Sequence, residues 1–200
     1  VRCRVLQRAS INKLTERKVR IMSTVPIITI KATNPYERGL QYGEQAKEYI
    51  WKCLNYYKNQ FQKSGQEWYR VQKCAMEFCK EVEKLYPDQI NEVRGIAEGA
   101  GVSVEDIMVI NSRYEITKFP KLPECTTGAV LPEATANHHT YAIKNWDFNI
   151  EARNHIVFLV IRNEDFWLAG FTEAGQMIRD GVNNYGIALC ANNLQSVEDH

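Results

Sequence analysis

Cys125 is the residue of this sequence that is best placed to act as a nucleophile. It follows the proline-bounded segment 119–123 and lies among small polar residues, where a thiolate can be stabilised and reached by a substrate. Most of the other cysteines alternate with apolar residues at expected helix or strand positions, which is typical of buried, inert thiols: Cys53, Cys74, Cys79 and Cys190. Cys125 is therefore the candidate nucleophile, with an ordinary structural thiol as the alternative interpretation.

The four histidines are not well placed to activate Cys125, and we interpret them as solvated or core-edge side chains: His138, His139, His155 and His200. Adjacent strand residues point to opposite faces, which argues against His138 and His139 as a metal pair. The cysteines show no paired metal-ligand spacing, so we expect neither a metal site nor a cofactor. A nucleophile can instead use an N-terminal amine as its base, which requires cleavage of the peptide bond before Cys125.

Helices are expected in the region that precedes Cys125. Asn34 and Pro35 provide an N-cap and a first-turn proline, and Ser103 with Asp106 forms a capping box. Apolar residues recur at spacings of three and four, and Pro87, Gly99 and Gly101 interrupt them. The predicted helices cover residues 34–61, 67–85, 88–98 and 103–114.

Strands are expected after Phe119, where the periodicity changes to two. The predicted strands cover residues 126–131, 139–146, 155–162, 166–172 and 186–192, and one more covers 25–31 near the start. Long helices followed by a run of antiparallel strands indicate an α+β fold in which helices cover the sheet. No stretch approaches the ~18 uninterrupted apolar residues of a membrane span.

The formal net charge of +1 conceals an uneven distribution of charge. Residues 1–21 contain seven basic residues and one acidic residue, whereas residues 22–200 contain 18 basic and 23 acidic residues. We expect residues 1–21 to be a non-structural basic extension, with a transit segment or a binding arm as alternatives. The acidic remainder argues against a nucleic-acid binder, and without a secretory apolar region we expect a cytoplasmic protein.

Five short motifs resemble, in order, those of the acyl-coenzyme A:6-aminopenicillanic acid acyltransferase family of N-terminal-nucleophile (Ntn) cysteine hydrolases. They occupy residues 111–115, 124–127, 144–148, 171–175 and 181–189, and the resemblance extends from residue 25 to about residue 195. It implies an α+β fold of the Ntn αββα sandwich type, begun by residues 125–200. A mainly helical pro-region over residues 22–124 would precede it as the α chain. The family's second-half asparagine and arginine would lie beyond His200.

The resemblance also implies a self-processing precursor. The thiol of Cys125 would attack the carbonyl of Glu124, an N-to-S acyl shift would form a thioester, and water would release the pro-region, which stays bound. The new α-amine and the thiol have ordinary pKa values near 7.7–8.0 and 8.5, so both can exchange protons near neutrality. Thr126 and Thr127 would position the bond to be cleaved, with ordinary strand threonines as the alternative.

Further roles follow from the same resemblance. Asp147 matches the aspartate that holds the α-amino group of the nucleophile, with a turn or surface carboxylate as the alternative. Asn192 or Asn193 would supply a backbone N–H to an oxyanion hole, with a plain turn asparagine as the alternative. Trp146 and Phe148 would line an acyl pocket or pack in the core.

The last residues singled out are Arg113 and Glu115, which we expect to form an ion pair at a helix end. A role in maturation is the alternative.

The function implied is that of an acyltransferase or amidohydrolase that cleaves or transfers the acyl group of an amide through a thioester on Cys125. The substrate would be a small-molecule amide or an acyl-coenzyme A, and a homo-oligomer is compatible with the sequence. A penicillin V or conjugated bile-acid amidase is one alternative. A truncated, catalytically silent domain that acts only in interactions is the other.

Overall fold

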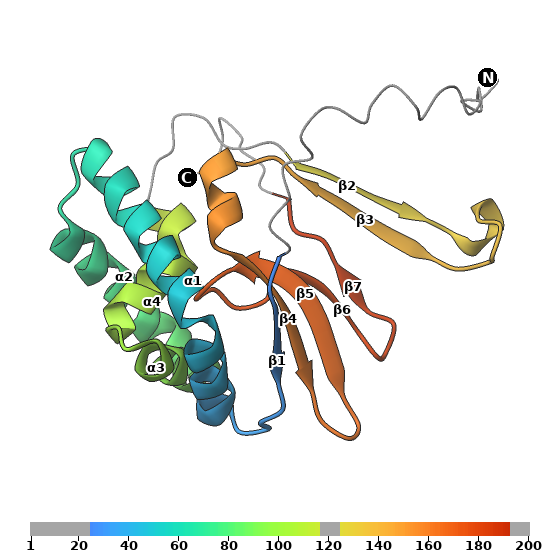
Figure 1. Ribbon diagram of the computed structural model, residues 1–200, viewed down its shortest axis with the longest axis horizontal. Helices are drawn as coiled ribbons and strands as arrows, with labels where there is room; N and C mark the ends of the chain where they lie inside the picture. The colour runs from blue at the N-terminus through green and yellow to red at the C-terminus, as the bar shows by residue number, and fades with distance from the viewer. Residues whose placement is uncertain (1–24, 117–124, 193–200) are drawn as a thin grey trace, which may run out of the picture.

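The computed structural model describes residues 25–116 and 125–192. Within these ranges the chain forms four α-helices, seven strands and two short 3₁₀ helices (Figure 1). The helical part consists of β1 (Ile27–Ile30), α1 (Pro35–Lys63), α2 (Trp68–Leu85), α3 (Pro87–Ala100) and α4 (Val104–Ile116). The strand-rich part consists of β2 (Cys125–Val130), η2 (Pro132–Ala134), β3 (Tyr141–Trp146), η3 (Ile150–Asn154), β4 (Ile156–Arg162), β5 (Trp167–Glu173), β6 (Asp180–Asn183) and β7 (Ala188–Leu189). The expected change from helices to strands and the α+β class are confirmed.

The helices begin and end where the capping residues predict. The side chain of Asn34 accepts hydrogen bonds from the backbone N–H groups of Tyr36 and Glu37, at 2.9 and 3.3 Å, and α1 starts at the following proline. Ser103 likewise accepts from the N–H of Asp106, at 3.1 Å, before α4. Gly101 ends α3 in the left-handed conformation, with φ of 67°. The predicted bounds of all four helices are therefore correct to within a few residues.

Two pairs of glycines bring the backbones of α1 and α3 into contact. A Cβ atom added to Gly39 would lie 2.0 Å from the carbonyl oxygen of Glu92, and one added to Gly95 would lie 2.0 Å from that of Tyr36. Gly43 and Gly99 meet the opposite helix in the same way. The four glycines therefore allow a helix crossing that is too close for any larger residue.

The strands form two separate sheets. The larger one has the order β1-β4-β5-β6-β7, in which β1 is parallel to β4 and the other neighbours are antiparallel. The predicted antiparallel run is confirmed for β4 and β5, but the strand expected over residues 186–192 is reduced to Ala188–Leu189. The sequence prediction also missed β6. The smaller sheet is the antiparallel hairpin of β2 and β3, which extends away from the body of the molecule (Figure 1).

The core lies between the helices and one face of the five-stranded sheet (Figure 1). Ile28 and Ile30 of β1 and Val157 and Leu159 of β4 are buried there, with exposed fractions of 5% or less. The opposite face of the sheet is open, and Phe158 and other apolar side chains lie on it partly exposed. No helix within residues 25–116 and 125–192 is long and apolar enough to cross a membrane.

Candidate active site

Cys125 is the first residue of β2, and its side chain is partly exposed. It borders a cavity of about 210 Å³ whose other walls come from α4, β3, the residue before β6 and the residues after β7. The cavity is lined by Tyr114, Glu115, Cys125, Trp146, Arg179, Ala191 and Asn192. The structure thus brings the candidate nucleophile together with residues that lie up to 67 positions away in the sequence. Glu124, on the other side of the proposed cleavage point, lies outside the described residues.

The register of the hairpin decides which side chains share a face with Cys125. Cys125 pairs with Trp146, and Thr127 pairs with Lys144. Directly opposed residues of antiparallel strands project to the same side, so these four share one face. Thr126 projects to the other face, so of the two threonines only Thr127 lies on the nucleophile's side.

Asn192 is held against this face of the hairpin by its side chain. Its Nδ2 donates to Oγ1 of Thr127 at 3.2 Å, and its Oδ1 accepts from Nζ of Lys144 at 3.0 Å. Asn192 also borders the cavity of Cys125, so both its ordered side-chain amide and the backbone N–H expected from the sequence lie at this cavity's rim. Asn193, the other candidate for an oxyanion N–H, lies outside the described residues.

The two aromatic residues of the 144–148 motif stack on each other, with ring centroids 4.8 Å apart and an interplanar angle of 13°. Trp146 also lies 6.1 Å from the ring of Phe171, and the guanidinium of Arg179 lies 4.7 Å from its centroid. Trp146 borders the Cys125 cavity, whereas Phe148 borders a neighbouring cavity of about 260 Å³. The pocket predicted for both residues is thus divided between two cavities that share Trp146.

Asp147 lies on the neighbouring cavity, together with Phe148. Its carboxylate is exposed and accepts from Nδ2 of Asn145, at 3.2 and 3.4 Å to its two oxygens. It does not border the cavity of Cys125 in the described structure. Its predicted contact with the α-amino group of Cys125 remains a prediction.

Arg113 corrects one expectation from the sequence. It does not form its ion pair with Glu115, two residues along α4, but with Glu173 at the end of β5. Its Nε also donates to the hydroxyl of Tyr57, at 2.7 Å, and its side chain is fully buried. Glu115 is exposed and borders the Cys125 cavity instead. The reason is geometric: residues two apart on a helix point in different directions.

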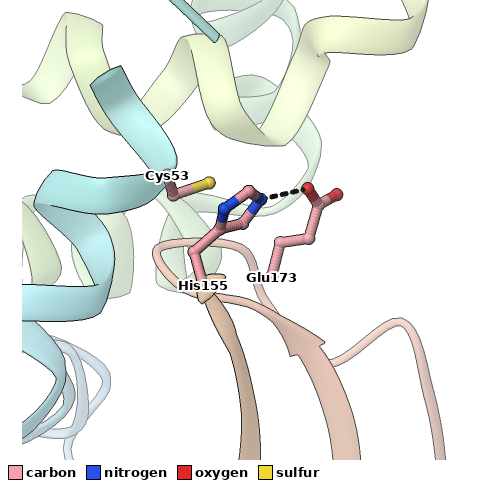
Figure 2. A group of neighbouring side chains, drawn as sticks. All are labelled: Cys53, His155 and Glu173. Atoms are coloured by element: carbon pink, nitrogen blue, oxygen red, sulfur yellow. Dashed lines mark hydrogen bonds and ion pairs between the residues drawn. The ribbon is translucent and has the colours of Figure 1, made fainter. Parts of the chain in front are cut away.

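Glu173 is the centre of a buried polar network between α1, α4 and the sheet. Figure 2 shows its contact with His155. Its Oε1 accepts from the hydroxyl of Tyr57 at 2.7 Å and lies 3.0 Å from Nε2 of His155. Burial would raise the pKa of Glu173, but the positive charge of Arg113 and the hydrogen bonds from His155 and Tyr57 hold the pKa below its usual value. His155, which was expected to be solvated or at the core edge, is only 1% exposed.

Cys53, His155 and Glu173 place one potential ligand atom each within 4.8 Å of one another, all of them buried (Figure 2). The surrounding charges do not suit a cation, because Arg113 already pairs with the carboxylate. Burial also raises the pKa of Cys53 well above its usual value, which keeps the sulfur protonated. We therefore interpret His155 and Glu173 as part of a hydrogen-bonded structural network, with Cys53 buried beside them.

The remaining cysteines only partly follow the expectation of buried thiols. Cys53 and Cys79 are buried, as predicted. Cys74 is exposed on α2 and Cys190 is partly exposed after β7, so the prediction was wrong for these two. The apolar neighbours of Cys74 did not show which face of α2 meets the core. Those of Cys190 did not show that β7 ends before it.

Sequence reasoning assigned no role to several residues around Cys125. Arg179 and Tyr114 border the cavity, and Lys144 bonds to Asn192. Only Lys144 left a usable signal, since a lysine that alternates with Trp146 on a strand next to the nucleophile must share its face.

Two comparisons with known proteins bear on this geometry. The family described as acyl-coenzyme A:6-aminopenicillanic acid acyl-transferase matches residues 134–199. The 40 kDa form of the acyl-coenzyme A:6-aminopenicillanic-acid-acyltransferase of Emericella nidulans is 25% identical over 169 residues, which cover 84% of this chain and 46% of that protein. The chain thus spans about half the length of this curated relative. The family match includes the motifs at 144–148, 171–175 and 181–189, and both comparisons confirm the resemblance. The chain is therefore similar to acyl-coenzyme A:6-aminopenicillanic acid acyltransferases, at modest identity.

Proposed function

We propose that this chain carries the nucleophile of a self-processing Ntn acyltransferase or amidohydrolase, with Cys125 as the residue that forms a thioester. The observation that carries the proposal is the cavity that Cys125 shares with Trp146 and Asn192. These residues come from three of the motifs or their borders, and the family match supports an acyl-transferring enzyme.

The self-processing step uses groups that stand at the start of β2. The sulfur of Cys125 attacks the carbonyl carbon of Glu124, the C–N bond breaks, and the thiol proton passes to the departing nitrogen. Water then hydrolyses the thioester, which restores the thiol and leaves a free α-amine on Cys125. That amine serves as the base in later turnovers: it takes the proton of the thiol, which attacks the acyl donor, and passes this proton to the coenzyme A thiolate or amine that leaves. The acyl group then passes from the thioester to an amine or to water, whose proton returns to the thiol.

Asn192 would stabilise the oxyanion of both steps. It borders the cavity, and its side-chain amide is oriented by hydrogen bonds at both of its ends. A donor that is fixed before the reaction stabilises developing negative charge without a reorganisation cost. The acyl group of the substrate would lie beside Trp146, which borders the same cavity.

The domain organisation follows from the same proposal. Residues 22–124 would be the α chain and residues 125–200 the start of the β chain. Contacts across the proposed cut support a retained α chain, because β1 pairs with β4 and Arg113 pairs with Glu173. In an αββα sandwich a second sheet would cover the open apolar face of β1 and β4.

The substrate class is an acyl-coenzyme A or a small-molecule amide. The Emericella relative is named for acyl transfer from acyl-coenzyme A, and an acyl-coenzyme A would act here as a substrate and not as a resident cofactor.

Intact-mass spectrometry of the full chain tests the proposal. We expect two fragments that divide between Glu124 and Cys125, slower division in Cys125→Ser and none in Cys125→Ala. Incubation with octanoyl-coenzyme A should then add one acyl group to the peptide that begins with Cys125.

Cys74→Ala is the matched control, because it removes an exposed thiol on α2, a helix that contributes no residue to the lining of the cavity. Division that continues in Cys125→Ala would overturn the assignment of the nucleophile. An undivided 23.1 kDa chain that accepts no acyl group would favour the catalytically silent alternative.

A further inference from the structure

Lys144 is a buried cation beside the candidate nucleophile. Its side chain, on β3, is only 6% exposed and lies on the same face of the hairpin as Cys125. Its ammonium group donates to the carbonyl oxygen of Ala191 and to Oδ1 of Asn192, the latter at 3.0 Å. A buried ammonium group is costly unless it is paired, so these contacts must be accompanied by a negative charge.

Asp180 supplies that charge from the start of β6. Its side chain is 3% exposed, and its Oδ1 lies 3.8 Å from Nζ of Lys144. The same Oδ1 accepts from the backbone N–H of Ala191 at 2.6 Å, and Oδ2 accepts from Nε of Arg179 at 2.9 Å. Asp180 and Lys144 therefore hold the two backbone groups of Ala191, its N–H and its C=O respectively.

The position of Asn192 depends on this arrangement. Lys144 occupies the amide oxygen of Asn192, which leaves Nδ2 to point toward Thr127 and the face of Cys125. Because a lysine can only donate, it also fixes which end of the amide is the oxygen.

The hairpin and the five-stranded sheet are separate sheets, so backbone ladder bonds do not hold one against the other. Among the described residues, Lys144 contacts Asp180 and residues 191–192, and Asn192 contacts Thr127, which links the hairpin to the other sheet at the cavity. Trp146 adds its packing on Phe171 and its contact with the guanidinium of Arg179. The relative placement of Cys125 and Asn192 is thus controlled by few side chains.

We propose that Lys144 and Asp180 act as a positioning pair, which fixes residues 191–192 against β2 so that the amide of Asn192 faces the acyl oxygen at Cys125. This inference rests on the proposed function. Lys144 acts through Asn192 and need not touch the substrate. Its loss should therefore lower the rate of the chemical step more than the affinity for the donor.

The test compares Lys144→Met, Lys144→Arg and Asp180→Asn in the full chain. We expect Lys144→Met to slow self-division and thioester formation by about 10- to 100-fold, as for reacting groups displaced by about 1 Å. KM for octanoyl-coenzyme A should change much less than kcat, and Lys144→Arg should restore most of the rate. Lys84→Met is the matched control, because Lys84 forms an exposed ion pair with Glu81 on α2.

Hydrogen exchange provides a readout that does not need activity. The backbone amide of Ala191 should exchange faster in Lys144→Met and in Asp180→Asn, whereas amides of α1 should be unchanged. If Lys144→Met fails to fold, the same two measurements on Asp180→Asn decide, since Arg179 and Lys144 remain there. Unchanged exchange at Ala191 and an unchanged rate would overturn the positioning role. Division that persists in Cys125→Ala would instead overturn the proposed function. Hydrogen exchange at Ala191 would still show whether Lys144 and Asp180 fix residues 191–192.

Discussion

Arg113 at the end of α4 donates to the carboxylate of Glu173 at the end of β5, and neither side chain is more than 1% exposed. The pair joins the helical part of the chain to the sheet. In the sequence, Arg113 precedes segment 117–124, which leads to the candidate nucleophile, and Glu173 follows it. Two charges that are buried in this way depend on each other, because either one alone would be left without compensation.

Removal of Arg113 should therefore destabilise the protein strongly. We expect Arg113→Met to lower the free energy of unfolding by about 3–5 kcal/mol, because it leaves Glu173 buried without its cation. Urea denaturation followed by circular dichroism measures this change. The double variant Arg113→Met/Glu173→Leu should lose less than the single variant, since no isolated charge remains.

Arg94→Met is the control for Arg113→Met, because it breaks a partly exposed ion pair with Glu83 at the surface. Its cost should be below about 1 kcal/mol. Equal losses in Arg113→Met and Arg94→Met would show that the buried pair contributes no special stability.

The lowered pKa of Glu173 predicts how stability depends on pH. Burial favours the neutral acid, but Arg113, His155 and Tyr57 favour the carboxylate more, so the folded pKa lies below the unfolded value of about 4.3. A lowered folded pKa gives stability that is fully present above the unfolded pKa. This stability is lost as the pH falls through the folded pKa.

Unfolding measured between pH 7 and pH 2.5 should thus show a loss of stability below about pH 4.3. The Glu173→Gln variant should be less stable than the unaltered protein at neutral pH. It should also lose less of its free energy of unfolding on acidification. Glu81→Gln alters an exposed surface pair, so its free energy of unfolding should depend on pH as it does in the unaltered protein. If Glu173→Gln also showed the pH dependence of the unaltered protein, the acid sensitivity would belong to other carboxylates.

The sequence predicts the helices well because their determinants are local. Asn34 and Ser103 cap the helices that follow them, and the glycine at 101 ends α3, so each boundary depends on a few adjacent residues. Strand β6 was missed because its four residues include a glycine and have no clear alternation. The parallel pairing of β1 with β4 joins segments more than a hundred residues apart, for which no local signal exists.

The candidate site was predictable to a similar extent. Cys125, Trp146 and Asn192 were each singled out from the sequence, and in the structure they border one cavity, while their chemical roles stay predictions. The motifs could not show that Arg113 pairs with Glu173, because the pair depends on how α4 packs on the sheet. The local turn after β3 also directs Asp147 toward Asn145, which the motif alone does not reveal.

The cysteines should differ widely in their reactivity toward iodoacetamide. Cys74 is exposed and Cys125 is partly exposed, whereas Cys53 is fully buried. Burial, reinforced by the negative charge of Glu173, raises the pKa of Cys53 well above its usual value and suppresses the reactive thiolate. Peptide mass spectrometry after brief labelling at pH 8 should find Cys74 and Cys125 modified and Cys53 intact.

Labelling in urea is the control for this experiment, because unfolding should make Cys53 as reactive as Cys74. Modification of Cys53 in the folded protein at the rate of Cys74 would contradict its burial between α1 and the sheet.

The contact between α1 and α3 should tolerate no side chain at Gly95. A Cβ atom there would meet the backbone oxygen of Tyr36 at 2.0 Å, and backbone atoms cannot turn aside as a flexible side chain can. Gly95→Ala should therefore force the two helices apart and cost at least about 1–3 kcal/mol, despite the better helix propensity of alanine. Gly128→Ala on β2, where no atom lies within 4 Å of the added Cβ, is the matched control and should leave stability nearly unchanged.

If both variants unfold at the same urea concentration as the unaltered protein, the helices can separate freely. The close crossing would then not be what positions α1 under β1 and β4.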